Sequence, residues 1–255
     1  MQSPIQPYVI KISGHELDDS AYLASFAAAA AEIARTTPLI VVHGGGKTIS
    51  AMQQKMGIEP RYIDGIRITD PDSLSLVEMV LRGSVNTMLV RAFINAGLDA
   101  QGMSGVDRGL IHATKMLHVS EDMGFTGVVE SVRADVLLDM LDMGVTPVIA
   151  PLGLGKDSAY NINADVVAGA VAGAVDADRL YFLSNVPGVL VNETLVERLT
   201  PQQVESLIAD GTIFGGMIPK VRTALDALNS GVKQAVITDL NGLKSRGGTV
   251  FSASA

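Results

Sequence analysis

The chain has 255 residues, 47% hydrophobic and 18% charged, so it can bury a large core and its composition argues against disorder. A net charge of −8 argues against a nucleic-acid or anionic-membrane partner, and the absence of cysteine excludes disulfides and thiolate metal sites. Residues 1–7 show no signal-peptide pattern, and the longest apolar stretch, residues 166–175, is too short to span a bilayer. These features together predict a cytoplasmic protein.

The first half of the chain alternates strand and helix patterns. Residues 8–12 and 39–42 read as buried strands, and residues 22–35 and 48–56 as helices, which is how a parallel, doubly wound sheet begins. A long helical pattern runs from residue 70 to residue 94, with Gly83 and Asn86 as candidate interruptions. Residues 110–132 predict a small antiparallel excursion around a turn-rich centre.

The second half returns to the alternation. The remaining predicted helices cover residues 134–143, 164–175, 201–210 and 219–229, and the remaining strands cover residues 146–150, 180–183, 235–238 and 249–252. A turn-rich patch, residues 153–163, separates two of these elements, and residues 238–248 are predicted to lack a helix. Because no linker separates independent domains, we expect two lobes that share one sheet and divide near residue 177.

Three consecutive glycines, Gly44, Gly45 and Gly46, follow the apolar strand that ends with His43. Without a Cβ atom, this backbone can turn tightly and bring its N–H groups close to a ligand at the start of the next helix. Free N–H donors and the dipole at a helix N-terminus favour an anion, so the pattern indicates a phosphate or carboxylate site. A purely steric role in the turn is the alternative, and for His43 we expect a structural role.

Three cationic residues stand next to turn glycines. Lys11 lies inside the first apolar strand, Lys220 follows a double-glycine turn, and Arg67 lies between β-branched residues after a turn. A buried charge is unfavourable unless a partner compensates it, so Lys11 favours a functional role over an exposed edge strand. For Lys220 and Arg67, a solvent-exposed position is the simpler alternative.

The segment Asn161-Ile162-Asn163-Ala164-Asp165 precedes a helix of small residues. Asn163 is a candidate N-cap, and Asp165 a first-turn acid that the helix dipole favours. The functional alternative is that Asp165 pairs with both Lys11 and Lys220 and holds the two cations against their mutual repulsion.

Taken in order, eight such motifs make the chain resemble the amino acid kinase family and, within it, the branch that phosphorylates N-acetylglutamate. The motifs are Lys11-Ile12-Ser13-Gly14, Val42-His43-Gly44-Gly45-Gly46, Gly65-Ile66-Arg67-Ile68-Thr69-Asp70, Val77-Glu78-Met79-Val80-Leu81, Gly124-Phe125-Thr126-Gly127, Asn161-Ile162-Asn163-Ala164-Asp165, Val186-Pro187-Gly188-Val189 and Gly215-Gly216-Met217-Ile218-Pro219-Lys220. The resemblance implies an α/β fold, a three-layer αβα sandwich with a mainly parallel central sheet. It also implies an acceptor-binding lobe (1–176) and a nucleotide-binding lobe (177–255).

The resemblance also implies roles for individual residues in a transfer from ATP to the side-chain carboxylate of N-acetyl-L-glutamate, in arginine biosynthesis. Lys11 and Lys220 would neutralise the phosphoryl group in transit, and Asp165 would position both lysines. Mg²⁺ would be bound through the ATP phosphates. The acceptor would be held by Arg67, Asn161, Gly44 and Gly45, and the nucleotide by Lys11, Gly14, Gly45, Ser184, Gly215, Gly216, Met217 and Lys220.

Several positions depart from the family pattern, among them Asp64, which replaces the usual asparagine, and residues 83–87, where two lysines are missing. Ser13 stands in place of the first glycine of a pair, and Asn185 in place of a common aspartate, so both contacts to the nucleotide are in question. An N-terminal extension carried by arginine-sensitive, hexameric relatives is missing. We therefore expect a homodimer without arginine feedback.

Three other functions stay open. A kinase of a carrier-linked aminoadipate or glutamate is suggested by Ser104-Gly105-Val106-Asp107, although the net charge of −8 disfavours docking of an acidic carrier. A kinase of another carboxylate or of carbamate is the second alternative, and the sequence around Arg67 argues against it. The third is a non-catalytic, regulatory relative, which the presence of Lys11, Asp165 and Lys220 together opposes.

Overall fold

The computed structural model describes residues 5–14 and 17–253. Residues 1–4, part of the segment examined for a signal peptide, therefore lie outside the described residues. Among the described helices, none combines the length and the apolar character needed to cross a membrane.

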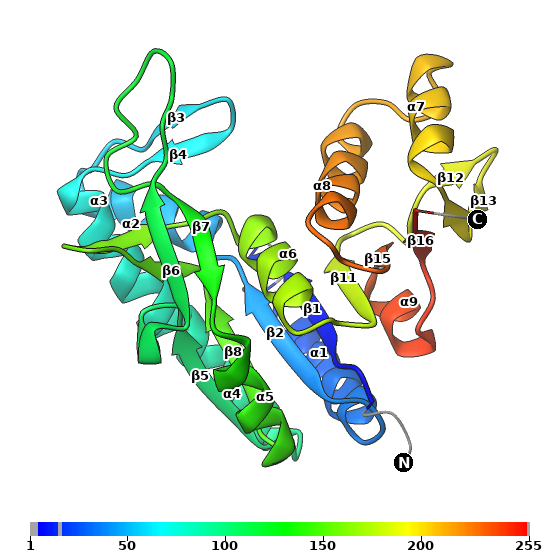
Figure 1. The fold of residues 1–255 in the computed structure, drawn as a ribbon, viewed down its shortest axis with the longest axis horizontal. Coiled ribbons are helices and arrows are strands. Elements are labelled where there is room, and N and C mark those ends of the chain that lie inside the picture. Colours follow the sequence, from blue (N-terminus) through cyan, green and yellow to red (C-terminus); the bar gives the residue numbers. More distant parts are fainter. Residues whose placement is uncertain (1–4, 15–16, 254–255) are drawn as a thin grey trace.

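An eight-stranded sheet forms the centre of the molecule (Figure 1). Its strand order is β14-β16-β15-β11-β1-β2-β8-β5, and every neighbouring pair is parallel except β15 with β16. Its strands are β1 (Tyr8–Ile12), β2 (Leu39–His43), β5 (Ala100–Ser104), β8 (Thr146–Ala150), β11 (Arg179–Leu183), β14 (Arg198–Leu199), β15 (Ala235–Thr238) and β16 (Thr249–Phe251). Because β1 lies between β2 and β11, one continuous sheet runs through both halves of the chain.

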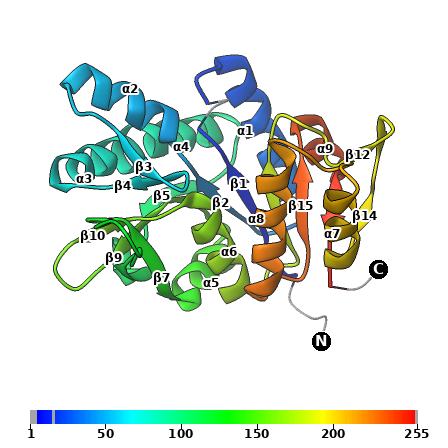
Figure 2. The same cartoon turned by 90° about the horizontal axis from the view of Figure 1, so that it is seen from above.

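Helices cover both faces of this sheet, which confirms the predicted three-layer sandwich (Figure 2). One face carries α1 (Ser20–Ala34), α4 (Asn86–Asn95) and α9 (Leu240–Ser245). The other carries α5 (Ala134–Asp142), α6 (Ala164–Ala174) and α8 (Met217–Asn229), with α7 (Pro201–Ala209) packed against α8.

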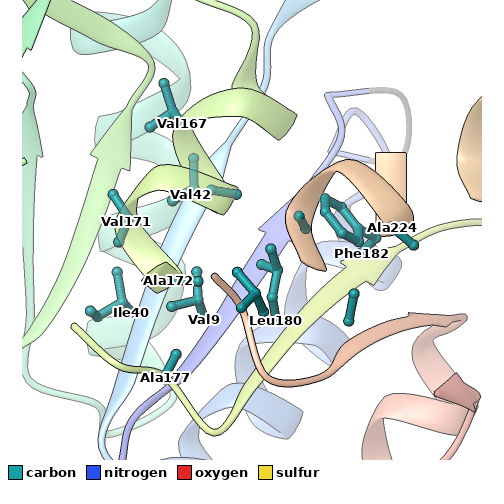
Figure 3. Packing of buried hydrophobic residues seen from close by; sticks show 14 of the residues in the cluster. Val9, Ile40, Val42, Val167, Val171, Ala172, Ala177, Leu180, Phe182 and Ala224 are labelled. Atoms are coloured by element: carbon teal, nitrogen blue, oxygen red, sulfur yellow. The ribbon is translucent and has the colours of Figure 1, made fainter. Parts of the chain in front are cut away.

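The small-residue helix α6 packs over the middle of the sheet. Figure 3 shows Val167, Val171 and Ala172 of α6 above Val9 of β1 and Ile40 of β2, all five of them buried. Burial of apolar surface contributes roughly 25 cal/mol per Å², so unbroken apolar strands of this kind drive the assembly of the centre. Small side chains let α6 lie close to the sheet, which fixes the position of its N-terminus at the strands' carboxyl ends.

The long helical pattern of residues 70–94 is one continuous helical stretch with a change of geometry in its middle. Asp70 accepts a hydrogen bond from Ser73 N and caps α3 (Pro71–Glu78), which is followed by a π-helical segment (Met79–Val85) and then by α4. The predicted interruption near Gly83 is confirmed as this wider turn. Asn86 is the first residue of α4, and its side chain is buried.

A second, four-stranded sheet confirms the predicted antiparallel excursion and extends it, in the order β10-β9-β6-β7. Its members are β6 (Ile111–Lys115), β7 (Gly127–Val132), β9 (Leu152–Leu154) and β10 (Ala159–Asn161). A hairpin of β3 (Arg61–Ile63) and β4 (Ile66–Ile68) lies beside it, next to α2 (Gly46–Met56). The remaining elements are β12 (Leu190–Val191), β13 (Thr194–Leu195) and a 3₁₀ turn (Asp107–Gly109).

The prediction that residues 238–248 lack a helix is wrong, because α9 lies there. Asp239 caps α9 by accepting a hydrogen bond from Gly242 N at 2.7 Å, and Leu243 buries its side chain completely. Six residues make too few turns for an apolar period to be recognised, so the cap and one core contact define this helix. The edge strand β5 was not predicted, since Ala-Gln-Gly-Met-Ser contains no apolar run.

Candidate active site

Three loops meet at the carboxyl edge of the central sheet because their strands end in register. Ile12 of β1 pairs with His43 of β2 on one side and with Leu183 of β11 on the other. The loops that follow begin at Ser13, Gly44 and Ser184. In open parallel sheets this edge is where ligands bind.

Two clefts open at this edge and share three residues, Lys11, Ser13 and Asp165. The first, of about 630 Å³, is also lined by Phe182, Leu183, Ser184, Asn185, Pro219, Lys220, Thr223 and Ile237. The second, of about 680 Å³, reaches from the glycine triplet to the β3–β4 hairpin and contains Gly14, Gly44, Gly45, Arg67 and Asn161. The clefts thus adjoin at these three residues, where a group bound in one cleft lies next to the other.

Lys11 and Asp165 form an ion pair at this shared point. The Lys11 Nζ to Asp165 Oδ1 distance is 2.9 Å, and the lysine side chain is only 14% exposed. Asp165 stands in the first turn of α6, whose N-cap Asn163 accepts a hydrogen bond from Asp165 N at 2.7 Å. The predicted cap is therefore confirmed, and so is the predicted contact of Asp165 with Lys11.

Lys220 does not pair with Asp165 as predicted. Among the described residues its Nζ donates instead to Ser184 Oγ at 2.6 Å and to Asn185 Oδ1 at 3.4 Å, both in the loop after β11. Lys220 comes from the first turn of α8 and lines the first cleft together with Lys11. The two lysines thus approach the shared point from different halves of the chain, each held by its own partner.

The glycines of the two central loops lie so close together that larger residues would not fit. A Cβ atom on Gly14 would lie 3.0 Å from Gly45 Cα and 3.3 Å from Gly45 N, and one on Gly45 would lie 2.6 Å from Leu81 Cδ2. The backbone at this contact and at the N-terminus of α2, where N–H groups favour an anion, lines the second cleft. This cradle suits the phosphate oxygens of a nucleotide.

Arg67 is buried, contrary to the solvent-exposed alternative. Its guanidinium donates to Gln53 Oε1 and, at 2.9 Å, to Ser50 Oγ, and it lies 4.7 Å from the centre of the Tyr62 ring. Burial lowers the pKa of Arg67, although it keeps its charge. Among the described residues no carboxylate pairs with it. A buried guanidinium held only by neutral groups leaves charge available for an anionic ligand in the second cleft.

Asn161 is oriented by a threonine pair beneath the same cleft. Its Nδ2 donates to Thr69 Oγ1 at 3.0 Å, and Thr126 Oγ1 donates to Arg67 O at 2.6 Å. The threonines are almost completely buried, so Asn161 and the backbone of Arg67 are held by one network that joins β4, β7 and β10. The structure thus brings Asn161 and Arg67 together, as predicted.

His43 is completely buried between the glycine triplet and α4. Its Nδ1 lies 3.1 Å from Gly44 O, and its Nε2 lies 3.0 Å from Asn86 Nδ2. Burial, which disfavours the charged imidazole, is the main cause that lowers its pKa to about 4, and the charge of the nearby Arg82 acts in the same direction. His43 is therefore neutral at physiological pH, in agreement with the structural role expected for it.

The depressed pKa of His43 predicts that stability decreases in acid. In the unfolded chain, a histidine takes up a proton near pH 6.5. In the folded protein, His43 resists protonation down to about pH 4. Between these two pH values the unfolded state therefore binds more protons than the folded state. From pH 7.5 to pH 5 the free energy of unfolding should fall by about 2 kcal/mol on account of this group. Urea unfolding of the wild type and of His43→Asn at both pH values measures it. A parallel loss in both proteins would contradict the prediction.

Sequence reasoning missed the residues that support the charged groups. Ser50 and Gln53 stand one turn apart on α2 and hold Arg67, and Asn86 holds His43. The available signal was that Gln53 lies one turn after Ile49, on the side of α2 that the structure buries. Gly215, Gly216 and Met217 lie at the start of α8, one turn before Lys220, and are not among the residues that line either cleft. Their contact with a nucleotide stays a prediction.

Among the described residues, no group of three or more acidic or histidine side chains could hold a metal ion. A magnesium ion that is carried on nucleotide phosphates needs at most one or two protein carboxylates. Asp165, at the shared point of the clefts, is the acidic residue placed to reach one. One carboxylate at the clefts therefore fits a magnesium ion that enters bound to the nucleotide phosphates.

Comparison with known proteins agrees with this geometry. The sequence profile described as "Amino acid kinase family" matches residues 6–239. A protein of Roseiflexus sp. (strain RS-1), named acetylglutamate kinase, is 52% identical over 244 residues, which is 96% of this chain and 93% of that protein. The acetylglutamate kinase of Chloroflexus aurantiacus (strain ATCC 29366 / DSM 635 / J-10-fl) is 47% identical over 246 residues, 96% of each chain.

A solved structure has the same fold. The protein smu.665 from Streptococcus mutans UA159 aligns with a TM-score of 0.78 at 29% sequence identity, over 97% of this chain and 98% of that one. The similarity thus extends over nearly the whole length of both chains.

Proposed function

Because the chain belongs to the amino acid kinase family, we propose that it transfers the γ-phosphoryl group of ATP to the side-chain carboxylate of N-acetyl-L-glutamate. The product is an acyl phosphate, and the reaction belongs to arginine biosynthesis. Support for this acceptor comes from the relatives named acetylglutamate kinase, which are 52% and 47% identical over nearly the whole chain.

The observation that carries the proposal is the junction of the two clefts at Lys11 and Asp165. We assign the cleft with Ser184 and Lys220 to the nucleotide and the cleft with Arg67 and Asn161 to the acceptor. With this assignment the γ-phosphate lies at the junction, between the glycine cradle and the two lysines. Direct transfer requires the two substrates to meet at such a point.

On the acceptor side, Arg67 binds the α-carboxylate of N-acetylglutamate through its guanidinium, and Asn161 donates a hydrogen bond to the same molecule. Gln53 and Ser50 already fix the guanidinium, so little side-chain entropy is lost when the acceptor binds. The side-chain carboxylate then points toward the junction. Being ionised at neutral pH, it attacks without a general base.

In the transfer step, a carboxylate oxygen forms a bond to the γ-phosphorus while the bond to the bridging oxygen of ADP breaks. The charge that spreads over the equatorial oxygens is met by Lys11 and Lys220 and by the N–H groups of Gly14 and Gly45. Asp165 holds Lys11 in place at 2.9 Å. When bound, magnesium neutralises part of the phosphate charge.

Several other expectations stay predictions on this basis. They are the division into lobes at residue 177, the homodimer without arginine feedback, the cytoplasmic location and the nucleotide contacts of Gly215, Gly216 and Met217.

Asn185 departs from the family's aspartate, and here its amide oxygen accepts from Lys220 at 3.4 Å. A neutral amide leaves the full charge of Lys220 available to the phosphate, so we expect this departure to be compatible with catalysis.

Formation of the acyl phosphate tests the proposed function directly. Hydroxylamine trapping with ATP and Mg²⁺ should give product with N-acetyl-L-glutamate and far less with free glutamate or aminoadipate. Omission of Mg²⁺ should abolish the signal. Silence with all three acceptors, from folded protein that still binds ATP, would overturn the proposal in favour of a carrier-linked acceptor or a regulatory relative.

A further inference from the structure

A chain of polar groups runs from strand β8 of the central sheet to the glycine cradle. Asn86, which is completely buried, donates through Nδ2 to Val148 O at 2.9 Å and contacts His43 Nε2 at 3.0 Å. His43 Nδ1 in turn contacts Gly44 O at 3.1 Å. The proposed reaction uses neither side chain directly, so this buried arrangement calls for its own explanation.

Only one arrangement of protons satisfies this chain. Val148 O is a carbonyl and can only accept, so the atom of Asn86 facing it must be the amide nitrogen. The second proton of that nitrogen points to His43 Nε2, which must therefore be the unprotonated acceptor. The imidazole proton is then on Nδ1, from which it is donated to Gly44 O. Asn86 thereby selects the tautomer of His43.

The selected tautomer fixes the peptide unit between Gly44 and Gly45. A trans peptide is planar, and its C=O and N–H groups point in opposite directions. Holding Gly44 O toward His43 therefore turns the N–H of Gly45 away from His43. The preceding amide is also fixed, because Gly44 N donates to Ile12 O at 2.8 Å. The contact with His43 thus adds to these backbone bonds and holds the peptide unit between Gly44 and Gly45 in one orientation.

We propose that His43 and Asn86 are positioning residues, which aim the N–H of Gly45 into the cradle where the transferred phosphoryl group is stabilised. The inference deepens the proposed function and rests on it for its kinetic test. Its prediction about the tautomer does not depend on the reaction.

Two local features of the chain make room for Asn86. The π-helical segment, Met79–Val85, ends immediately before it, and such segments occur frequently at functional sites. In the edge strand β5, a Cβ atom on Gly102 would lie only 2.0 Å from Asn86 Oδ1. Glycine in a strand and a π-turn in a helix both reduce local stability. The absence of a Cβ atom at Gly102 therefore leaves the space that the side chain of Asn86 occupies.

Two amide substitutions of His43 separate positioning from packing. In His43→Asn, the NH₂ group lies near the position of Nδ1 and can still donate to Gly44 O. In His43→Gln, the NH₂ group lies near the position of Nε2, so this hydrogen bond to Gly44 O is lost. If the contact to Gly44 aims the cradle, kcat of the Gln variant should be at least about tenfold lower than that of the Asn variant. The KM for the acceptor should change less than about twofold in both. Equal kcat values would overturn the proposal.

A control variant and a spectroscopic readout complete the test. Val41→Ala removes a buried side chain from the same strand and should lower the melting temperature without a selective loss of kcat. In ¹⁵N NMR spectra, His43 of the wild type should show the Nδ1–H tautomer, and Asn86→Leu should shift it toward Nε2–H or a mixture. An Nε2–H tautomer in the wild type would overturn the proposal whether or not the protein phosphorylates N-acetylglutamate.

Discussion

Replacing Lys220 by alanine is expected to lower kcat by about 10²- to 10³-fold while leaving the affinity for the acceptor nearly unchanged. Its ammonium lies in the cleft assigned to the nucleotide, where it is held by Ser184 and Asn185 at 2.6 and 3.4 Å. Because it has no carboxylate partner among the described residues, its charge is available to the phosphoryl group as negative charge develops. An interaction that strengthens in the transition state appears in kcat rather than in binding.

Steady-state kinetics of Lys220→Ala and isothermal titration with N-acetylglutamate measure the two quantities. Lys233→Ala is the matched control, because Lys233 lies 13 residues after Lys220 and pairs with Asp176 at 2.8 Å at the surface. The control should retain wild-type kcat. If kcat of Lys220→Ala stays within about threefold of the wild type, Lys220 does not neutralise the transferred group.

Replacing Arg67 by alanine should instead raise the dissociation constant of the acceptor by about 100-fold. Hydrogen bonds to a charged group are worth about 1.5–3 kcal/mol each, and each 1.4 kcal/mol changes affinity tenfold. The affinity for ATP should be unchanged, because Arg67 lines only the cleft assigned to the acceptor. Isothermal titration with each ligand separately checks both expectations.

Arg61→Ala is the control for this substitution. Arg61 belongs to the same hairpin, but it is 62% exposed and pairs with Glu121 at 3.3 Å. Exposed pairs contribute roughly 0–1 kcal/mol, so neither acceptor affinity nor stability should change much. A similar loss of acceptor affinity in both variants would show that the hairpin as a whole, rather than the guanidinium of Arg67, determines binding.

Much of the site was predictable because its elements are encoded locally. The runs that form β1 and β2 are apolar and β-branched, and glycines mark where both strands end. Asn163 and Asp165 carry the preferences of a helix start, which the structure confirms. For such elements, neighbouring residues supply the physical reason, whether burial on both faces, turn geometry or a cap.

Contacts between distant segments were not predictable in the same way. Lys220 was expected to meet Asp165, but the loop after β11 lies closer to it and supplies Ser184 as its acceptor. Helix α9 was missed because one cap and one buried leucine define it, and β5 because only its place at the edge of the sheet makes it a strand.

The sequence by itself determined the class of fold, the strands of the central sheet other than β5 and β14, and the residue types at the site, since these depend on local periodicity, turns and caps. Tertiary structure decided which charges pair, how deeply Arg67 is buried and which nitrogen of His43 carries the proton. Each of these depends on groups far apart in sequence, such as Gln53 with Arg67 or Asn86 with His43. Their hydrogen bonds have a defined direction only after the sheet and its helices have packed.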